Sequence, residues 1–396
     1  MGGSYKSNAK VLVVHCVDTE GPIGGNVRRR PDGSKEFMDN WKDIKASLED
    51  ITCDSFRKNN LDTTGSVFIL NWFIMDFTGF STNPKKRICA YNNTYDNIKS
   101  LNTSEDQFYW HYHQPPICGT GDMWSSDWES SSEHYNILGH RLIERADFPE
   151  AYRAGGTIED NKCSRWLEDN IMIDFSNRVS DNSYDTSNIF DFNWYNAPDS
   201  LGWYHPSESN FIKKGSMKRY IAKCVDLESR LHILTQEKVD KAFSEAKSKN
   251  KNVILSYFSH DHRDMREETF RAISMVNNAS IKHKIPFEWS DPVAAIQKTD
   301  NIKKINVKIG AEKINKNQIK IHFNNAIYQK SPLVYTKDDK GIIKYHKIDI
   351  LRKPNCPYYL EYCILNIVDE DRVLGVGCTS LSGNKSVFVT KISDID

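Results

Sequence analysis

Short apolar runs, some of which end in polar residues, recur along the chain as far as residue 260. The runs cover Lys10 to Asp18, Gly65 to Trp72, Phe108 to His113, Ala151 to Gly155, Ile171 to Phe175 and Asn252 to His260. Continuous apolar runs of this kind are typical of parallel strands covered on both faces. Helical patterns lie between several runs and after the last, at Trp41 to Lys58, Ser216 to His232, Gln236 to Lys247, Arg266 to Lys284 and Pro292 to Lys298. Strands that alternate with helices predict a parallel α/β architecture.

The pattern changes after Asp300. Apolar and polar residues alternate in Ile305 to Ile309, Ile319 to Phe323, Tyr359 to Leu365 and Ser386 to Thr390. Such alternation predicts antiparallel strands with one buried face. A chain of 396 residues also exceeds the roughly 250–300 residues that one core usually serves. We therefore expect two domains, an α/β domain over residues 1–300 and a small antiparallel β domain over residues 301–396.

Charge and composition exclude several classes of partner. Lys plus Arg and Asp plus Glu each number 53, so no overall field would draw the protein to nucleic acid. No stretch approaches the ~20 consecutive apolar residues that span a bilayer, and the first residues lack the apolar core of a secretion signal. The nine cysteines contain no C-x-x-C pair, which fits reduced thiols. We expect a cytoplasmic protein without membrane insertion, and no pattern predicts its oligomeric state.

Two pairs of polar side chains at predicted strand ends indicate a metal site. Asp18 and Glu20 end the first run, and His111 and His113 end the third. In an extended segment residues i and i+2 face the same side, so each pair can face one pocket. Imidazole and carboxylate are typical zinc ligands, and three protein ligands leave room for water and substrate. The competing interpretations are a solvated strand end for the acids and a hydrogen-bonded pair of core histidines.

Three further strand ends carry candidate chemistry. Arg153, which precedes two glycines, can orient a carboxylate by a bidentate contact, or it can be structural. Asp174 on the next strand is one candidate partner, and otherwise a cap or turn residue. His260 and His262 follow an apolar strand, where a histidine tuned by an adjacent carboxylate can act as a general acid. We favour His260, which is nearer to the strand end; the alternatives are extra metal ligands and exposed loop residues.

In their order along residues 10–300, these motifs resemble those of the polysaccharide-deacetylase superfamily, which includes chitin and peptidoglycan deacetylases. Val17 to Gly21 is similar to its first motif, which places a catalytic base on Asp18 and a metal-binding acid on Glu20. The resemblance makes His111 and His113 metal ligands and His260 the general acid. It makes Arg153 the residue that steadies the base, and Asp174 the fourth motif. It implies a distorted (β/α)7-type barrel that removes an N-acetyl group from an amino sugar or glycan precursor.

The motifs also depart from that family. Its acids are usually adjacent and its histidines four residues apart, whereas one residue separates each pair here, and the arginine motif lacks the usual proline. Two other functions stay open. His111 to Pro116 resembles a signature of some α-glucan-acting glycoside hydrolases on a related barrel, and altered motifs also suit a non-catalytic carbohydrate-binding protein. For the deacetylase, zinc is the expected divalent ion, although cobalt, nickel and iron suit the same donors.

Overall fold

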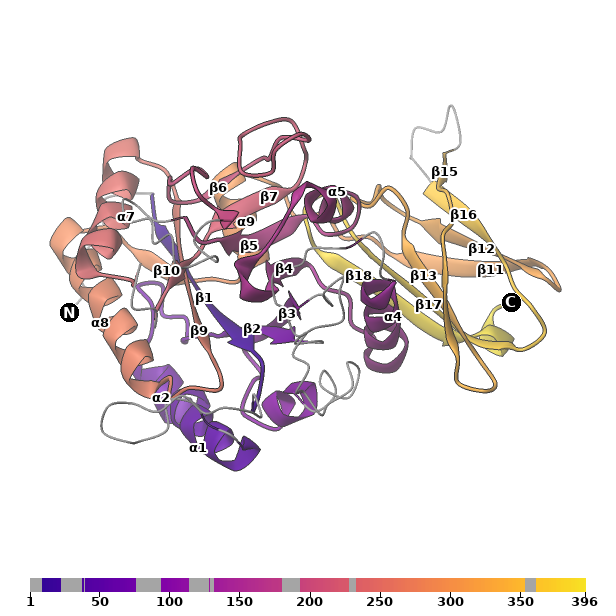
Figure 1. Cartoon of the computed structure of the whole chain (residues 1–396), viewed down its shortest axis with the longest axis horizontal. Helices are drawn as coiled ribbons and strands as arrows, with labels where there is room; N and C mark the ends of the chain where they lie inside the picture. The colour runs from indigo at the N-terminus through magenta and orange to yellow at the C-terminus, as the bar shows by residue number, and fades with distance from the viewer. Residues whose placement is uncertain are drawn as a thin grey trace.

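A curled, mostly parallel sheet forms the larger part of the structure (Figure 1). The computed structural model describes residues 9–22, 38, 40–75, 94–113, 128, 132–179, 193–227, 233–352 and 361–396. Ten strands join in the order β6-β7-β5-β4-β3-β2-β1-β9-β8, and β10 also pairs with β1. The strands are β1 (Val11–Thr19), β2 (Asn71–Met75), β3 (Gln107–Tyr112), β4 (Ala151–Ala154), β5 (Ile173–Asn177), β6 (Trp203–Tyr204), β7 (Tyr220–Lys223), β8 (Val225–Asp226), β9 (Val253–His260) and β10 (Phe287–Trp289).

Because the sheet curls, strands from both of its sides pair with one short segment of the chain, which contains β7 and β8. Strand β7 pairs with β5, whereas β8, which follows after the single residue Cys224, pairs with β9. All strand pairs in the sheet are parallel except β6 with β7. The expected α/β architecture with a mostly parallel sheet is confirmed. The sheet is only half-closed, so the expected distorted (β/α)7-type barrel is not confirmed.

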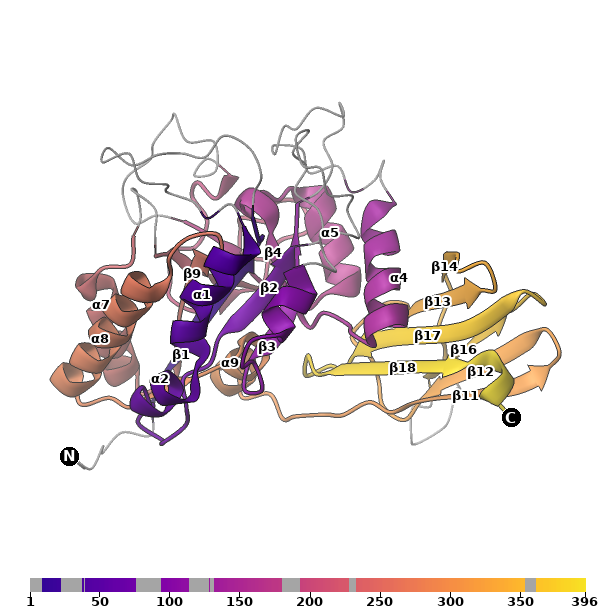
Figure 2. The same ribbon diagram turned by 90° about the horizontal axis from the view of Figure 1, so that it is seen from below.

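Helices cover the outer face of the curled sheet (Figures 1 and 2). They are α1 (Trp41–Thr52), α2 (Asp54–Asn59), α4 (Glu133–Arg145), α5 (Asn161–Asn170), α7 (Gln236–Lys249) and α8 (Arg266–His283). The helix α9 (Pro292–Asp300) instead packs Val293 and Ile296 with the inward side chains of β1 and β9. Short 3-10 helices occur at η1 (Gly155–Thr157) and η2 (Ile392–Asp394). Leu48 of α1, Phe243 of α7 and Val276 of α8 pack in one core cluster with the outward side chains of β1 and β9. Leu138 and Leu142 of α4 and Leu167 of α5 form another cluster with Trp110 and Tyr152 of β3 and β4.

The inner face of the curl is apolar for most of each strand. Leu12, Val14 and Cys16 of β1 pack there with Tyr109 of β3 and Phe258 of β9. Because side chains alternate along a strand, the next inward positions are Asp18, His111 and His260. The polar strand ends therefore lie directly beyond this inner apolar core.

Two antiparallel sheets occupy the segment after α9, as the alternation after Asp300 predicts, although residues 305–308 of the first predicted strand lie outside any strand. One has the order β11-β12-β16-β15 and the other β14-β13-β17-β18. Their strands are β11 (Ile309–Asn315), β12 (Gln318–Phe323), β13 (Leu333–Asp338), β14 (Ile343–His346), β15 (Leu351–Arg352), β16 (Glu361–Asn366), β17 (Asp371–Thr379) and β18 (Lys385–Lys391). Ile321, Leu365, Val334 and Val376 share the core between these sheets. The second sheet contacts α4, where the Tyr335 hydroxyl donates to the Tyr135 carbonyl at 2.8 Å.

One predicted helix is wrong. The segment Ser216 to His232 contains β7 and β8 instead, and its residues 228–232 lie outside the described part of the chain. Its charged side chains Arg219, Lys223 and Asp226 are buried and ion-paired. In an amphipathic helix such residues would lie on the solvent-exposed face. Smaller differences are that the predicted helix Trp41 to Lys58 breaks at Cys53, and that β2 begins at Asn71 rather than Gly65.

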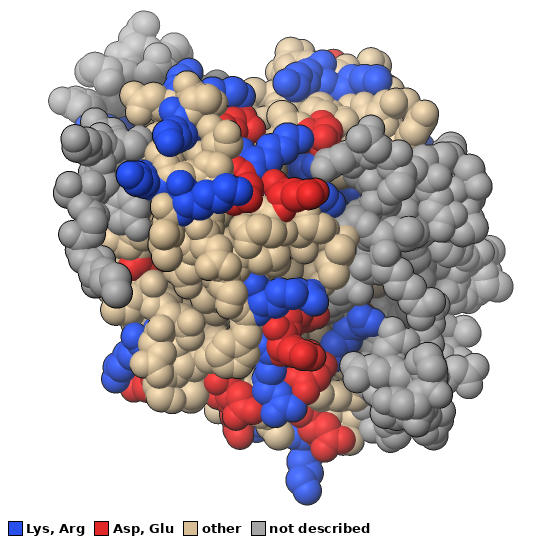
Figure 3. Space-filling model, turned by 90° about the vertical axis from the view of Figure 1, so that its left-hand side faces the viewer, with Lys and Arg blue, Asp and Glu red and all other residues tan. Residues whose placement is uncertain are grey.

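The surface carries both signs of charge. Figure 3 shows basic and acidic side chains interleaved on the face of the molecule that lies toward α7 and α8. Within α7, Lys249 pairs with Glu245, and Lys282 of α8 pairs with Asp240 of α7. Within the described ranges, none of the helices combines the length and the apolar character needed to cross a membrane.

Candidate metal centre

Neighbouring strands of the curled sheet bring the predicted site residues together at their carboxyl ends. Asp18 of β1 lies in register with His260 of β9, and His111 of β3 lies in register with Arg153 of β4. Glu20 follows the end of β1, and His113 follows the end of β3. Parallel pairing places these ends at one edge, so residues far apart in sequence share one site.

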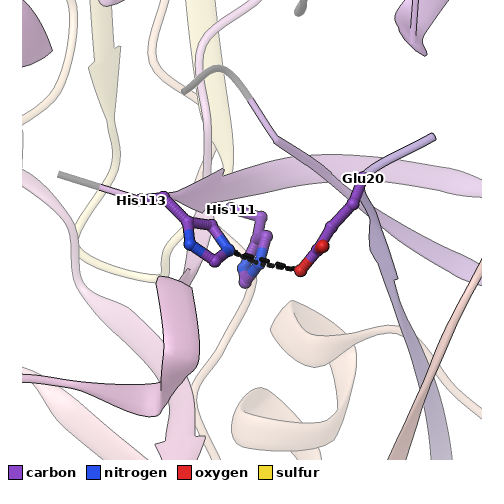
Figure 4. A group of neighbouring side chains, drawn as sticks. All are labelled: Glu20, His111 and His113. Atoms are coloured by element: carbon purple, nitrogen blue, oxygen red, sulfur yellow. Dashed lines mark hydrogen bonds and ion pairs between the residues drawn. The ribbon is translucent and has the colours of Figure 1, made fainter. Parts of the chain in front are cut away.

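Glu20, His111 and His113 meet in a buried triad (Figure 4). The Nε2 atoms of the two histidines lie 3.0 Å apart, and the Glu20 Oε1 atom lies 3.3 Å from that of His113 and 3.6 Å from that of His111. Ligands about 2.0–2.1 Å from a tetrahedral zinc ion lie about 3.3 Å from one another. The three observed distances bracket that value, so this donor set fits a divalent ion.

The protonation states of the triad also suit a metal. His111 Nδ1 lies 3.1 Å from the Arg153 carbonyl oxygen, which can only accept, so Nδ1 carries a proton and Nε2 is the ring nitrogen left to bind a metal. Burial lowers the pKa of His113 and keeps its ring neutral, although Glu20 opposes this shift. Burial alone would raise the pKa of Glu20, but His111 and His113 hold it well below its usual value. Neutral imidazoles and an ionised carboxylate are the forms that bind metal.

Asp18 stands beside the triad as a second ionised carboxylate. Arg153 Nε donates to its Oδ1 at 2.6 Å and Nη2 donates to its Oδ2 at 2.9 Å. Burial disfavours the charged form, but the charge of Arg153, assisted by His111, outweighs it and lowers the pKa of Asp18 to about 2. The guanidinium also donates to the Phe175 carbonyl and lies 4.1 Å from the Phe258 ring. Arg153 thus orients the carboxylate by the predicted bidentate contact.

The two histidines after β9 lie beside different carboxylates. His260 Nε2 is 3.9 Å from Asp18 Oδ2, and His262 Nδ1 is 3.8 Å from Glu20 Oε2. The His260 side chain is 25% exposed and that of His262 is 6% exposed. His260 is therefore the better placed of the two to meet a molecule that enters from solvent.

Asp174 does not join this site, and it is not the partner of Arg153. Its Oδ2 accepts from Arg219 Nη2 at 2.6 Å, and its Oδ1 accepts from the backbone and hydroxyl of Ser176. Asp174 is in register with Tyr152, the residue before Arg153, so strand alternation turns the two side chains to opposite faces of the sheet. The expected pairing of Asp174 with Arg153 is therefore wrong, and the catalytic role that the resemblance gives to Asp174 stays a prediction.

Two residues shape the site in ways that the strand-end pattern did not predict. A Cβ atom on Gly155 would lie 2.4 Å from Cγ of His113 and 2.7 Å from its Cα, so only glycine admits His113 at this position. Asp261 lies between His260 and His262 in the sequence and is a candidate for the adjacent carboxylate that tunes a histidine. Its carboxylate instead accepts from the backbone amides of Glu20 and Gly21. Gly155, two residues after Arg153, is visible in the sequence, but the space that it leaves for His113 depends on a contact between two strand ends.

Compared with protein-family models, the sequence matches none, and a search of curated proteins gives no match either. The interpretation of the site therefore depends on its own geometry.

Proposed function

We propose that this chain is a metal-dependent hydrolase that removes an N-acetyl group from an amino sugar or a glycan precursor. The observation that carries the proposal is the meeting of Glu20, His111 and His113 beside the separately held carboxylate of Asp18. A metal ion in the triad would polarise the amide carbonyl and lower the pKa of a water molecule. Zinc is the first candidate ion, because histidine nitrogens and a carboxylate oxygen are typical zinc ligands.

The chain's own residues divide the proton transfers between them. Asp18 is ionised and is oriented by Arg153, so it would accept the proton of the attacking water. His260 is partly exposed on the other side of Asp18, so it would donate a proton to the leaving amine nitrogen. Glu20 and the two triad histidines would hold the ion, and Arg153 would keep the base in place.

The carboxylates favour this chemistry over glycoside hydrolysis. A glycosidase needs one carboxyl group that stays protonated as the general acid. Asp18 and Glu20 both have lowered pKa values, so neither suits that role. Burial raises the pKa of Asp261 to about 7, but that side chain is fully buried and faces two backbone amides.

The proposal extends to the architecture. Strands β7 and β8 are separated by Cys224 alone and pair with β5 and β9. Counted as one strand, they would complete a ring with β1, β2, β3, β4, β5 and β9. We interpret the curled sheet as a distorted (β/α)7-type barrel on this basis, with residues 301–396 as a separate β domain.

The test is acetate release from a panel of free, nucleotide-linked, lipid-linked and polymeric N-acetylated sugars. Zinc-loaded protein should release acetate from at least one class, and chelated protein should not. Asp18→Asn should keep metal binding and lose about 10²–10⁴-fold in rate, because a general base contributes that much. His113→Ala should lose the metal. The control His283→Gln, in which the altered histidine lies on α8 beside Asp240, should change neither metal binding nor the rate.

Equal acetate release from chelated and metal-loaded protein would remove the hydrolase proposal. Sugar binding without turnover, at an affinity that Asp18→Ala leaves unchanged, would instead indicate a non-catalytic carbohydrate-binding protein.

A further inference from the structure

The carboxylate of Asp261 caps the turn that follows β1. Its Oδ1 accepts from the Glu20 amide at 2.8 Å and from the Gly21 amide at 3.0 Å, and its Oδ2 also lies 3.0 Å from the Gly21 amide. The Asp261 side chain is fully buried. It lies between His260 and His262 in sequence, yet its carboxylate is directed to the backbone of another strand end.

Glu20 needs such a contact because strand pairing stops before it. The register of β1 with β9 ends at Asp18, and the register with β2 ends at Thr19. One further backbone hydrogen bond continues the pairing of β1 with β9, from the Asp261 amide to the Asp18 carbonyl at 3.4 Å. Beyond that point, the two amides bound by Asp261 fix the backbone that carries the Glu20 carboxylate.

The turn itself leaves little freedom. Gly21 has a φ of +66°, a value that favours glycine, and a Cβ atom there would lie 2.4 Å from the Trp41 ring. The backbone at Glu20 is thus held between Asp261 on one side and a sterically confined glycine on the other. A shift of this turn would move the Glu20 Oε1 atom relative to His111 and His113.

We propose that Asp261 is a positioning residue for the metal centre, which holds Glu20 through its backbone at the place where its carboxylate meets the two histidines. The inference rests on the proposed metal site. Outer partners of metal ligands usually act on the ligand side chain. Asp261 acts on the main chain instead, and His262 is the side chain that lies near the second oxygen of Glu20.

The test compares zinc affinity, measured by competition with a chromophoric chelator, in wild type, Asp261→Ala and Asp261→Asn. Loss of an outer partner typically weakens metal binding about 10–100-fold, and we expect Asp261→Ala to fall in that range. Asp261→Asn should weaken binding less, because one oxygen can still accept from both amides. Asp264→Asn is the matched control, since Asp264 is three residues away and its partly exposed carboxylate pairs with Arg266; its affinity should equal that of wild type.

Amide hydrogen exchange in metal-free protein gives a readout that does not depend on the metal. A peptide covering residues 18–22 should exchange faster in Asp261→Ala, while peptides from β9 keep their protection. A folded Asp261→Ala protein with wild-type zinc affinity would overturn the inference and leave the proposed function standing. If that variant does not fold, Asp261→Leu, which keeps the side-chain volume but cannot accept from either amide, decides by the same criterion. If wild type itself binds no metal, the proposed function fails, and unchanged exchange at residues 18–22 would then overturn the holding role of Asp261 separately.

Discussion

Arg153 contacts both halves of the candidate site through different atoms. Its guanidinium binds the Asp18 carboxylate at 2.6 and 2.9 Å, and its carbonyl oxygen lies 3.1 Å from Nδ1 of His111. The side chain therefore orients the proposed base, while the main chain sets the tautomer of a proposed metal ligand. One strand end, on β4, couples the positions of two groups that lie on β1 and β3.

Replacing Arg153 should reveal how strongly the fold depends on this ion pair. Arg153→Met leaves the buried Asp18 charge without its counter-charge, which typically costs about 3–5 kcal/mol of unfolding free energy. Urea unfolding at pH 7 measures the change. Arg266→Met is the control, since this exposed arginine pairs with Asp264 and Asp50 and should contribute about 1 kcal/mol or less. Equal losses in both variants would contradict the importance assigned to the buried pair.

Asp174 should behave as a structural residue. It shares the buried Arg219 guanidinium with Glu159, which still balances the arginine charge in Asp174→Asn. This variant should therefore lower the unfolding free energy by about 1.5–3 kcal/mol, the usual contribution of a hydrogen bond to a charged group. Zinc affinity and the rate of acetate release per folded molecule should stay within about twofold of wild type. Asp369→Asn, which removes an exposed partner of Lys316, is the stability control. A large loss of rate without a loss of stability would restore the catalytic role that the family resemblance gave to Asp174.

Much of the site could be predicted because strand patterns are local. The apolar runs before Asp18, His111 and Arg153 marked the strand ends, and parallel pairing then required those ends to share an edge. The spacing of two within each pair also fixed which side chains face the same way. These arguments need only the period of the pattern, which a single sequence contains.

The features that the sequence did not predict depend on contacts between distant segments of the chain. Each buried charge of the β7–β8 segment has a partner of opposite sign elsewhere in the chain. The pairs are Arg219 with Asp174, Lys223 with Asp199, and Asp226 with Arg178. No local pattern identifies such partners. For the same reason the β7–β8 segment resembled an exposed helix in the sequence. The direction of the Asp261 carboxylate likewise follows from the turn at Glu20, a segment some 240 residues earlier.

Gly155 should be required for metal binding through His113. In Gly155→Ala the new Cβ atom would lie 2.7 Å from Cα of His113, a clash that rotation of the histidine ring cannot relieve. We expect zinc affinity to fall about 10-fold or more, with a stability loss of about 1–3 kcal/mol.

Gly139→Ala separates the loss of stability from the loss of zinc affinity. Its Cβ atom would lie 2.7 Å from the Tyr335 ring, where α4 meets the second antiparallel sheet. This variant should lose comparable stability and keep wild-type zinc affinity in the chelator competition. If Gly155→Ala also keeps wild-type affinity, the clearance at His113 does not govern the metal centre.

His134 should make the fold sensitive to acid at a place away from the candidate site. Its ring is buried among Trp128, Tyr135 and Trp166, and neither nitrogen has a hydrogen-bond partner within the described structure. Burial lowers the pKa of His134 from 6.5 to about 3. The unfolded chain therefore binds a proton on His134 between about pH 6.5 and pH 3, whereas the folded chain does not.

Stability must then fall as the pH drops through this window, because the proton favours the unfolded state. At pH 5 the cost is about 2 kcal/mol, and above pH 6.5 it disappears. His134→Phe keeps an aromatic ring and removes the titrating group, so its stability advantage over wild type should grow by about 2 kcal/mol between pH 7 and pH 5 in urea unfolding. His140→Gln, on the same helix, should show no such growth, since the His140 ring is half-buried and lies 3.2 Å from Glu144. Parallel stability curves for wild type and His134→Phe across this range would show that the buried ring takes up its proton without unfolding.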